Sequence, residues 1–292
     1  MKKPNFLIVG AAKSGTTSMC YYLNQHKDIF IPDFKEPQFF VFEKIKNRLH
    51  KYVDNIEDYV KLFKNRDEKI IGEGSVFYLF FYKQAIKNIK KYCDKDIKIL
   101  ILLRNPVTRC LSAYNHVSRN NLMEKMSFSA ALEKEEIRFK EDKNITPMIL
   151  YKNMGLYYNQ VKAYLDNFKH VKIVIYDDFN NNSQKVYNDV LSFLDVDQEY
   201  KINFNNRFNV GGWQWKNNFL KSVFLKQNFF KKAITLCFSK SFKNKVKTKS
   251  MNLAVNKQHV DSDIKSYLCG YYKKDVEKLS DLLNVDLSFW LK

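Results

Sequence analysis

"FLIVGAAKSGTTS", residues 6–18, is the stretch that decides the fold. Its apolar start, which ends at Gly10, predicts a short buried strand, and the spacing of the apolar residues after Thr17 predicts a helix. A loop between a strand and a helix N-terminus binds anions well, because successive backbone N–H groups face the same point. Lys13 adds a mobile cation to this loop, and Thr16 and Thr17 add hydroxyl donors. The stretch therefore predicts a phosphate-binding loop in an α/β protein.

The lysine of this loop stands in an unusual place for a nucleoside triphosphatase. The triphosphatase motif puts lysine directly before the closing Ser or Thr, where this chain has Thr16. A triphosphatase also needs a strand-terminal Asp to organise magnesium, whereas the strongest strand signal here ends at Arg104. The planar guanidinium of Arg104 favours a second phosphate. Anion sites at the loop and at Arg104 indicate a nucleotide with phosphates at both ends, and an ATP- or GTP-dependent kinase is the less favoured alternative.

Apolar periodicity along the rest of the chain predicts strands that alternate with helices. Asn105 is a good helix cap, and Pro106 fits the first helical turn. Residues 35–42 are expected to be extended or looping, because Pro37 disfavours a regular element. Strands are expected near 28–32, 96–104 and 171–176, and helices near 56–63, 82–92, 106–118, 127–139, 155–168 and 183–194. We therefore expect one α/β domain over residues 1–292, with a central, mainly parallel sheet flanked by helices.

The charge of the chain indicates anionic partners. Lys and Arg number 50 against 31 Asp and Glu, a net charge of +19, so the surface attracts anions in a salt-dependent way. Residues 216–249 carry many lysines, no acidic residue and interleaved Phe and Leu. One interpretation is a solvated lysine face on a packed helix, and the other is a surface that docks on an anionic membrane or glycan. The absence of arginine clusters and of a helix-turn-helix pattern argues against a nucleic-acid partner.

Cysteine usage and hydropathy predict the compartment. The five cysteines are widely spaced and form neither a CxxC pair nor a cluster with zinc-ligand spacing, so reduced thiols are expected. The N-terminal apolar run is too short for a signal peptide, and no segment reaches about 18 uncharged apolar residues. These features predict a cytoplasmic protein, with peripheral contact at the inner membrane face if residues 216–249 dock on lipid.

A second stretch, "LLRNPVTRCLSAYNH" at residues 102–116, completes a resemblance to a known family. Together with the first loop it resembles the sulfotransferases that use 3′-phosphoadenosine 5′-phosphosulfate (PAPS), especially bacterial enzymes and the domains that act on glycans. The resemblance covers most of the chain and implies a P-loop-like fold, release of adenosine 3′,5′-bisphosphate (PAP) and no metal. It implies that Arg104 and Ser112 hold the 3′-phosphate. It also implies a 5′-phosphosulfate site formed by Lys13, Ser14, Gly15, Thr16 and Thr17.

The resemblance also suggests where the transfer chemistry takes place. Negative charge develops on the phosphate oxygen that bridges to sulfur, and a lysine placed like Lys13 can neutralise it. "KEPQFF", residues 35–40, resembles the stretch that supplies the catalytic glutamate in glycan-modifying members, which assigns the general base to Glu36. Histidine is the base in the small-molecule branch, so His26 and His116 are alternatives.

Further stretches resemble the family less fully. "GEGSVFYL", residues 72–79, has Gly74 where some glycan enzymes have lysine, although Ser75 could still lie near the sulfuryl group. "RFNVGGWQWKNNF", residues 207–219, resembles a late loop that closes over the 3′-phosphate and suggests a contact from Arg207.

The acceptor follows only by inference from these features. A sugar hydroxyl on a bacterial polysaccharide or glycolipid is the first hypothesis, because of the Glu36 stretch and the basic residues 216–249. A small alcohol, phenol or lipid is the second. A catalytically inactive module that binds glycans or other anions with the same fold is the alternative outside the enzyme class.

Overall fold

A five-stranded parallel sheet forms the centre of the molecule. The computed structural model describes residues 2–34, 36–49, 51–120, 124–204, 213–215, 255–257 and 260–292. The strands are β1 (Phe6–Gly10), β2 (Ile29–Phe30), β3 (Ile70–Gly74), β4 (Lys98–Leu103) and β5 (His170–Ile175). Their order is β2-β3-β1-β4-β5, and every neighbouring pair is parallel. The prediction of a mainly parallel sheet is therefore confirmed.

The strand order reverses beside β1. The chain leaves β1 toward β2 and β3 on one side and then returns to β4 on the other side. Open α/β sheets bind ligands outside the carboxyl ends of their strands at such a switch point. The backbone N–H of Ala11, just after β1, donates to the carbonyl oxygen of Leu102 in β4 at 2.7 Å. The segments that follow β1 and β4 therefore start side by side.

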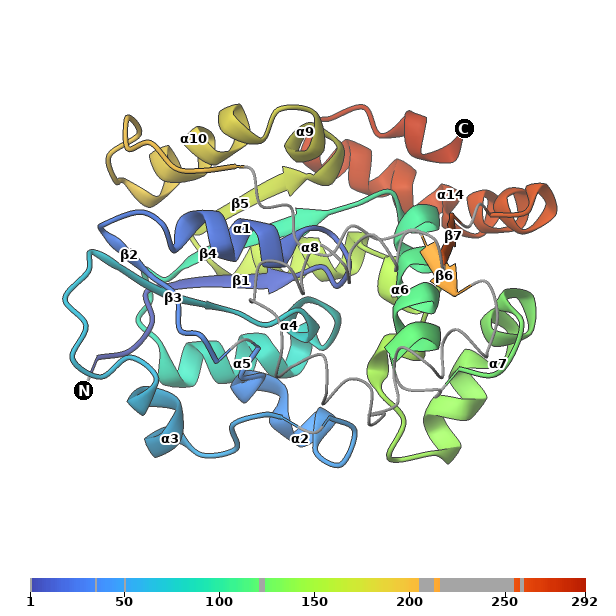
Figure 1. The fold of residues 1–292 in the computed structure, drawn as a ribbon, viewed down its shortest axis with the longest axis horizontal. Helices are drawn as coiled ribbons and strands as arrows, with labels where there is room; N and C mark the ends of the chain where they lie inside the picture. The colour runs from blue at the N-terminus through green and yellow to red at the C-terminus, as the bar shows by residue number, and fades with distance from the viewer. Residues whose placement is uncertain are drawn as a thin grey trace, which may run out of the picture.

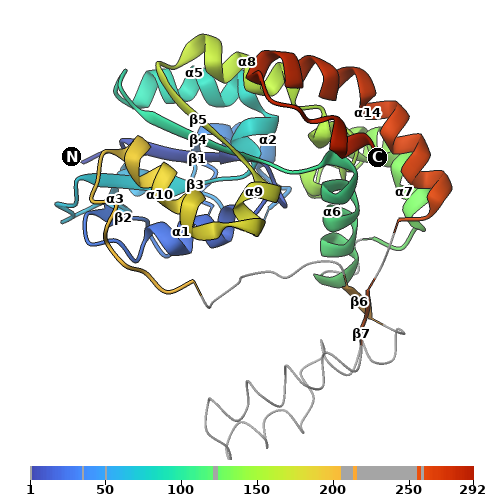
Figure 2. The same ribbon diagram turned by 90° about the horizontal axis from the view of Figure 1, so that it is seen from above.

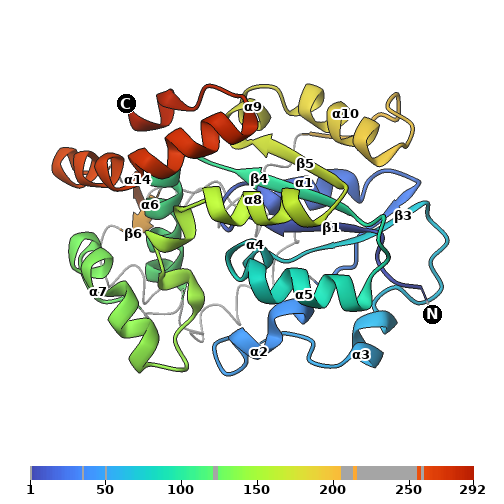
Figure 3. The same cartoon turned by 180° about the vertical axis from the view of Figure 1, so that it is seen from behind.

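Helices cover both faces of the sheet (Figures 1 and 2). One face carries α1 (Thr16–Leu23), α9 (Tyr176–Asn181) and α10 (Ser183–Leu194). The other carries α4 (Phe77–Phe80), α5 (Tyr82–Tyr92) and α8 (Tyr158–Asn167), and Figure 3 shows α5 and α8 in front of the strands. Beyond the carboxyl ends of the strands stand α6 (Pro106–Asn120), α7 (Phe128–Glu141) and α14 (Ser262–Leu283). The layers leave the carboxyl edge of β1 and β4 framed by α1 and α6.

Short elements complete the described chain. They are the 3₁₀ turns η1 (Phe39–Val41), η2 (Pro147–Ile149), η3 (Asn153–Gly155) and η4 (Ser288–Leu291), and the helices α2 (Phe42–Ile45) and α3 (Ile56–Lys61). A separate antiparallel pair joins β6 (Trp213–Trp215) to β7 (Val255–Lys257).

The two apolar cores explain the sequence of the central strands. Leu7 and Val9 belong to the core shared with α5 and α8, whereas Phe6 and Ile8 belong to the core shared with α1 and α10. Every residue of β1 is buried, because helices cover both faces. A strand of this kind is apolar at every position instead of alternating with polar residues.

The expected helices and strands are present to within a few residues of their predicted ends. Residues 35–42 were expected to be extended or looping, but η1 and the start of α2 lie there, because Phe39, Phe40 and Val41 turn into the core. No helix was predicted for α4, α9 or α14. The buried stripe of α14 nevertheless has a helical spacing: Leu268, Tyr272, Val276 and Leu279. The proposed basic helix over 216–249 lies outside the described residues.

Candidate active site

The first loop packs closely against α9 at a glycine. Gly15 caps α1 with φ 86°, in the left-handed region that favours glycine. A Cβ at Gly15 would lie 3.0 Å from two ring carbons of Tyr176, so the loop backbone passes directly against that ring. The hydroxyl of Ser14 is fully buried and has no hydrogen bond of normal geometry in the described structure. The loop therefore holds a buried donor beside the N-terminus of α1.

Arg104 joins this loop from the end of β4. Its Nη1 donates to the carbonyl oxygen of Lys13 at 3.2 Å, and its Nε donates to Thr108 Oγ1 at 3.0 Å. Its guanidinium carbon lies 4.8 Å from the centroid of the Tyr176 ring. Burial lowers the pKa of Arg104 from its usual 12.5, although nearby phenols and Asp177 act in the opposite direction. The guanidinium stays charged, because arginine does not lose its proton in proteins.

Ser112 lies on the same face of α6 as Thr108, which accepts a hydrogen bond from Arg104. Arg104, Thr108 and Ser112 follow each other at intervals of four, which aligns Thr108 and Ser112 along one side of the helix. Asn105 caps α6 as predicted, because its Oδ1 accepts from the backbone N–H of Val107 at 2.9 Å. The structure thus brings the two proposed 3′-phosphate residues onto one short row that starts at the loop.

Tyr157 is a site residue that the sequence analysis did not single out. Its hydroxyl donates to the carbonyl oxygen of Arg104 at 3.0 Å and lies near Ser14 Oγ, outside good hydrogen-bonding geometry. Its backbone N–H donates to Asp275 Oδ2 at 2.7 Å, which fixes it to α14. Burial raises the pKa of Tyr157 to about 12, so the phenol remains a donor. Tyr157 and Tyr176 come from distant segments, and no local sequence signal marks them as site residues.

Glu36 lies on the same edge of the sheet, in the segment that leads into η1. Gln38 Nε2 donates to Glu36 Oε2 at 3.3 Å, and the backbone N–H of Gln38 donates to Ser75 Oγ at 3.0 Å. The backbone N–H of Ser75 in turn donates to the carbonyl oxygen of Ile8 in β1 at 3.0 Å. Glu36 is therefore connected to the end of β1, which also leads into the loop of Lys13.

Backbone conformation distinguishes this group of residues from the rest of the described chain. The described chain contains seven non-glycine residues with positive φ. Four of them are Asn or Asp, which tolerate the left-handed conformation. The other three are Lys13, Glu36 and Gln38, with φ of 72°, 60° and 54°. Strained backbone of this kind persists where the surrounding structure holds it, commonly at functional sites. The two candidate catalytic residues are both among the three.

The alternative base His26 is engaged elsewhere. It is 2% exposed, at the far end of α1 from the loop. Its Nε2 bonds with the carbonyl oxygen of Asp197 at 2.9 Å, and its Nδ1 accepts from the backbone N–H of Asp28 at 3.1 Å. Both ring nitrogens of His26 are therefore engaged in hydrogen bonds to the backbone of Asp28 and Asp197. His116 lies on α6, one turn beyond Ser112.

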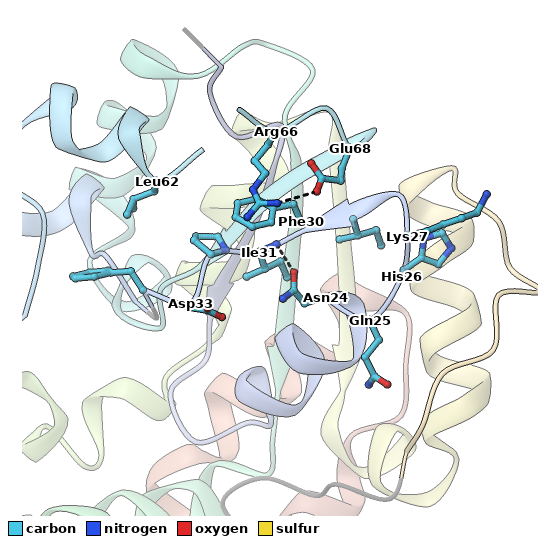
Figure 4. A pocket seen from close by; sticks show the side chains of 13 residues that line it. Asn24, Gln25, His26, Lys27, Phe30, Ile31, Asp33, Leu62, Arg66 and Glu68 are labelled. Atoms are coloured by element: carbon cyan, nitrogen blue, oxygen red, sulfur yellow. Dashed lines mark hydrogen bonds and ion pairs between the residues drawn. The ribbon is translucent and has the colours of Figure 1, made fainter. Parts of the chain in front are cut away.

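A cavity of about 550 Å³ lies beside the edge strand β2 (Figure 4). Arg66 stands over the Phe30 ring at 4.0 Å and pairs with Glu68 at 3.6 Å. Asn24 Oδ1 accepts from the backbone N–H of Ile31 at 2.7 Å. The lining runs from the exit of α1 toward the segment of Glu36: Asn24, Gln25, His26, Lys27, Ile29, Phe30, Ile31, Pro32, Asp33, Phe34, Leu62, Arg66 and Glu68. This cavity is distinct from the loop of Lys13.

The fold and the site together define a class of protein. A strand, loop and helix N-terminus at the switch point, joined by an arginine from the neighbouring strand, are the features of a P-loop-like α/β protein with a site for a phosphate-bearing ligand. The chain belongs to the sulfotransferase domain family, whose family model matches residues 3–259. Family and fold both support a transferase enzyme. The predicted family and the predicted single-domain fold are confirmed.

Known proteins similar to this chain agree with that assignment. A crystal structure of a sulfotransferase from Alicyclobacillus acidocaldarius is similar with a TM-score of 0.75 and 30% identity, and 100% of each chain is covered. The bifunctional heparan sulfate N-deacetylase/N-sulfotransferase 3 of Mus musculus is 25% identical over 306 residues, which covers 99% of this chain and 31% of the relative. The membrane-associated sulfotransferase kil1 of Dictyostelium discoideum is 36% identical over 112 residues, 38% of this chain and 22% of the relative. This chain therefore spans less than a third of the length of these curated relatives.

Two further predictions from the sequence concern Arg207 and membrane-spanning segments. Arg207 lies outside the described residues. In the part of the chain that the structure describes, no helix is long and apolar enough to cross a bilayer.

Proposed function

We propose that this protein moves a sulfuryl group from PAPS to an acceptor hydroxyl, with a sugar as the acceptor. The observation that carries the proposal is the bond between Arg104 Nη1 and the Lys13 carbonyl oxygen, which holds the two proposed anion sites next to each other. A nucleotide with phosphates at both ends suits such a pair, and use of PAPS is typical of the family. The proposed transferase unit is the whole chain, residues 1–292.

Donor binding in this proposal uses the loop and the α6 row. Lys13, Ser14, Gly15, Thr16 and Thr17 would hold the 5′-phosphosulfate through backbone N–H groups, hydroxyls and the lysine ammonium. Arg104 and Ser112 would hold the 3′-phosphate, and the Tyr157 hydroxyl fixes the backbone of Arg104. The buried Ser14 hydroxyl supports this role, because a ligand oxygen would satisfy it. The proposed donor site requires no metal.

Transfer itself would be a direct in-line displacement. The bond from sulfur to the acceptor oxygen forms as the bond from sulfur to the bridging phosphate oxygen breaks. Lys13 would neutralise the charge that develops on that leaving oxygen. Glu36 would take the proton of the acceptor hydroxyl, an effect typically worth about 10²–10⁴ in rate. PAP then leaves with both its phosphates.

A sugar acceptor is supported by the similarity to relatives named for heparan sulfate. The resemblance of residues 35–40 to a stretch of glycan-modifying members supports it as well. A hydroxyl of a bacterial polysaccharide or glycolipid is the specific form of the proposal. A small alcohol, phenol or lipid is the second candidate, and an inactive glycan-binding module is the third. We place the activity in the cytoplasm, with residues 216–249 against an anionic membrane face, which fractionation of cells would test.

Calorimetric titration with PAP, AMP and ATP with magnesium tests the donor site. Preferential, metal-independent binding of PAP is the expected result, and an acceptor screen with PAPS and labelled oligosaccharides, alcohols and phenols then separates the candidates. Preferential binding of ATP would overturn the proposal in favour of a kinase. Binding of PAP without transfer to any acceptor class would favour the inactive module.

A further inference from the structure

A buried carboxyl group lies behind the candidate base. Glu73 is the fourth residue of β3 and is 1% exposed. Its Oε2 accepts from Ser75 Oγ at 2.8 Å, and its Oε1 accepts from the Tyr59 hydroxyl at 3.3 Å. The hydroxyl of Tyr78 is also within reach of this carboxyl. An ionisable group in such a position is costly to bury, so its presence calls for a role.

Hydrogen bonds connect Glu73 to Glu36. Ser75 Oγ donates to Glu73 and accepts from the backbone N–H of Gln38 at 3.0 Å. The side chain of Gln38 then donates to Glu36 Oε2 at 3.3 Å. Gln38 is itself fully buried and adopts a positive φ, so Ser75 holds a residue whose backbone is under strain. Glu73, Ser75, Gln38 and Glu36 form one connected row.

Phenols and a thiol surround Glu73 on the elements packed against it. They are Tyr59 from α3, Tyr78 from α4, Cys93 after α5 and Tyr164 from α8. Burial raises the pKa of each of these groups, to about 12 for Cys93, so all four keep their protons near neutral pH. Among the described residues, Glu36 is the acidic group whose charge acts on Glu73. The charge of this cluster is therefore carried by the two carboxyl groups.

We propose that Glu73 is a positioning residue that sets the orientation of Glu36 through Ser75 and Gln38, and that protonation of Glu73 releases this arrangement. The inference rests on the proposed role of Glu36 as the base. While Glu73 is ionised, the proton of Ser75 points to Glu73, and a lone pair of Ser75 Oγ faces the N–H of Gln38. When Glu73 is protonated, its hydrogen bonds are no longer strengthened by charge, and one of its oxygens becomes an O–H donor. The Ser75 hydroxyl is then free to rotate away from Glu73.

The titration of Glu73 falls in a range where enzymes work. Burial, the largest cause, raises the pKa of Glu73 from 4.5 to about 7, and the charge of Glu36 acts in the same direction. Hydrogen bonds from Tyr78, Ser75 and Tyr59 oppose the rise. The arrangement around Glu36 should therefore be complete above pH 7 and be lost as the pH falls below it.

The test compares kcat for the unaltered protein and Glu73→Gln across pH 6–8.5, with PAPS and acceptor saturating. We expect kcat of the variant to be about tenfold to a hundredfold lower at pH 8, because misplacing a catalytic group costs this much. The ratio of the two kcat values should fall toward one at pH 6, where the unaltered Glu73 is protonated as well. A ratio that is near one at pH 8, or that stays constant across the range, would overturn the inference.

A matched control is Glu135→Gln on α7. Glu135 is also buried, and burial raises its pKa to about 6, but its carboxylate accepts from the backbone N–H groups of Lys152 and Asn153. The ratio of kcat of the unaltered protein to kcat of Glu135→Gln should not depend on pH. If Glu73→Gln fails to fold, Ser75→Ala breaks the same row while Glu73 stays in place, and the same loss of kcat at pH 8 is expected.

The failure of this inference is distinguishable from failure of the proposed function. Glu36→Gln with near-normal kcat would disprove the role of Glu36, whatever Glu73 does. Loss of kcat in Glu36→Gln, together with an unaltered pH profile in both Glu73→Gln and Ser75→Ala, would disprove the positioning role alone. Affinity for PAP should be unchanged in both Glu73→Gln and Ser75→Ala, because neither Glu73 nor Ser75 is among the residues proposed to hold the two phosphates.

Discussion

The donor side and the base side of the candidate site are built in different ways. On the donor side, cations and hydroxyls sit at the ends of regular elements, β1 with α1 and β4 with α6. On the base side, two carboxyl groups are held by η1, β3 and α4 through side-chain hydrogen bonds. The first arrangement suits an anion of fixed shape, and the second suits a group that gains and loses a proton. Changes on the two sides should therefore alter different measurements.

Glu36→Gln should have the largest effect, on chemistry alone. The proposed base would lose its proton-accepting charge, and kcat should fall by about 10²–10⁴ with PAP affinity unchanged. Single-turnover kinetics with PAPS, alongside calorimetry with PAP, measures both quantities. A parallel loss of PAP affinity would remove the contrast between the two sides.

Lys13→Ala should affect the donor side and the chemical step together. Without its ammonium, charge on the leaving oxygen is not neutralised, and kcat should fall by about 10²–10³. Lys162→Ala is a suitable control, because that exposed lysine pairs with Asp166 one turn further along α8. Near-normal turnover of Lys13→Ala in a folded protein would contradict the leaving-group role.

Arg104→Ala should affect donor affinity more than chemistry. Loss of a charge-assisted contact to the 3′-phosphate should weaken PAP binding by roughly 10–100-fold, with a much smaller effect on AMP. Arg104→Lys keeps the charge but not the planar fork, so it should recover only part of the affinity. Calorimetry with PAP and AMP measures the discrimination. Unchanged discrimination would show that Arg104 does not read the 3′-phosphate.

The smallest effect concerns stability and comes from the base side. Glu73 has a pKa of about 7 in the folded protein, above the usual 4.5. Its contribution to stability is therefore complete below about pH 4.5 and is lost as the pH rises through 7. Glu73→Gln removes this loss, so at pH 8 the free energy of unfolding of the variant should exceed that of the unaltered protein by on the order of 3 kcal/mol. Urea unfolding at pH 5.5 and pH 8 tests the sign, and a variant that is less stable at pH 8 would contradict it.

The donor side could be predicted from the sequence because its parts are local. The loop of Lys13, the strand before Arg104 and the Asn105 cap each follow from a few consecutive residues. The base side could not be predicted in this detail, because Gln38 meets Ser75 across 37 positions and Tyr59 meets Glu73 from another element. The role proposed for Glu36 was predicted by resemblance alone. Tyr157 and Tyr176 were missed for the same physical reason, since only tertiary packing brings them to Arg104.

The order of the strands also bears on how the protein behaves at high concentration. The sheet ends in β2 on one side and β5 on the other. β2 has only two residues, too few to template pairing with a strand of another molecule, and β5 carries Lys172 in its middle. Short or charged outer strands of this kind disfavour growth of the sheet from one molecule into the next. The same strand order that creates the ligand edge thus leaves the protein with outer strands that resist aggregation.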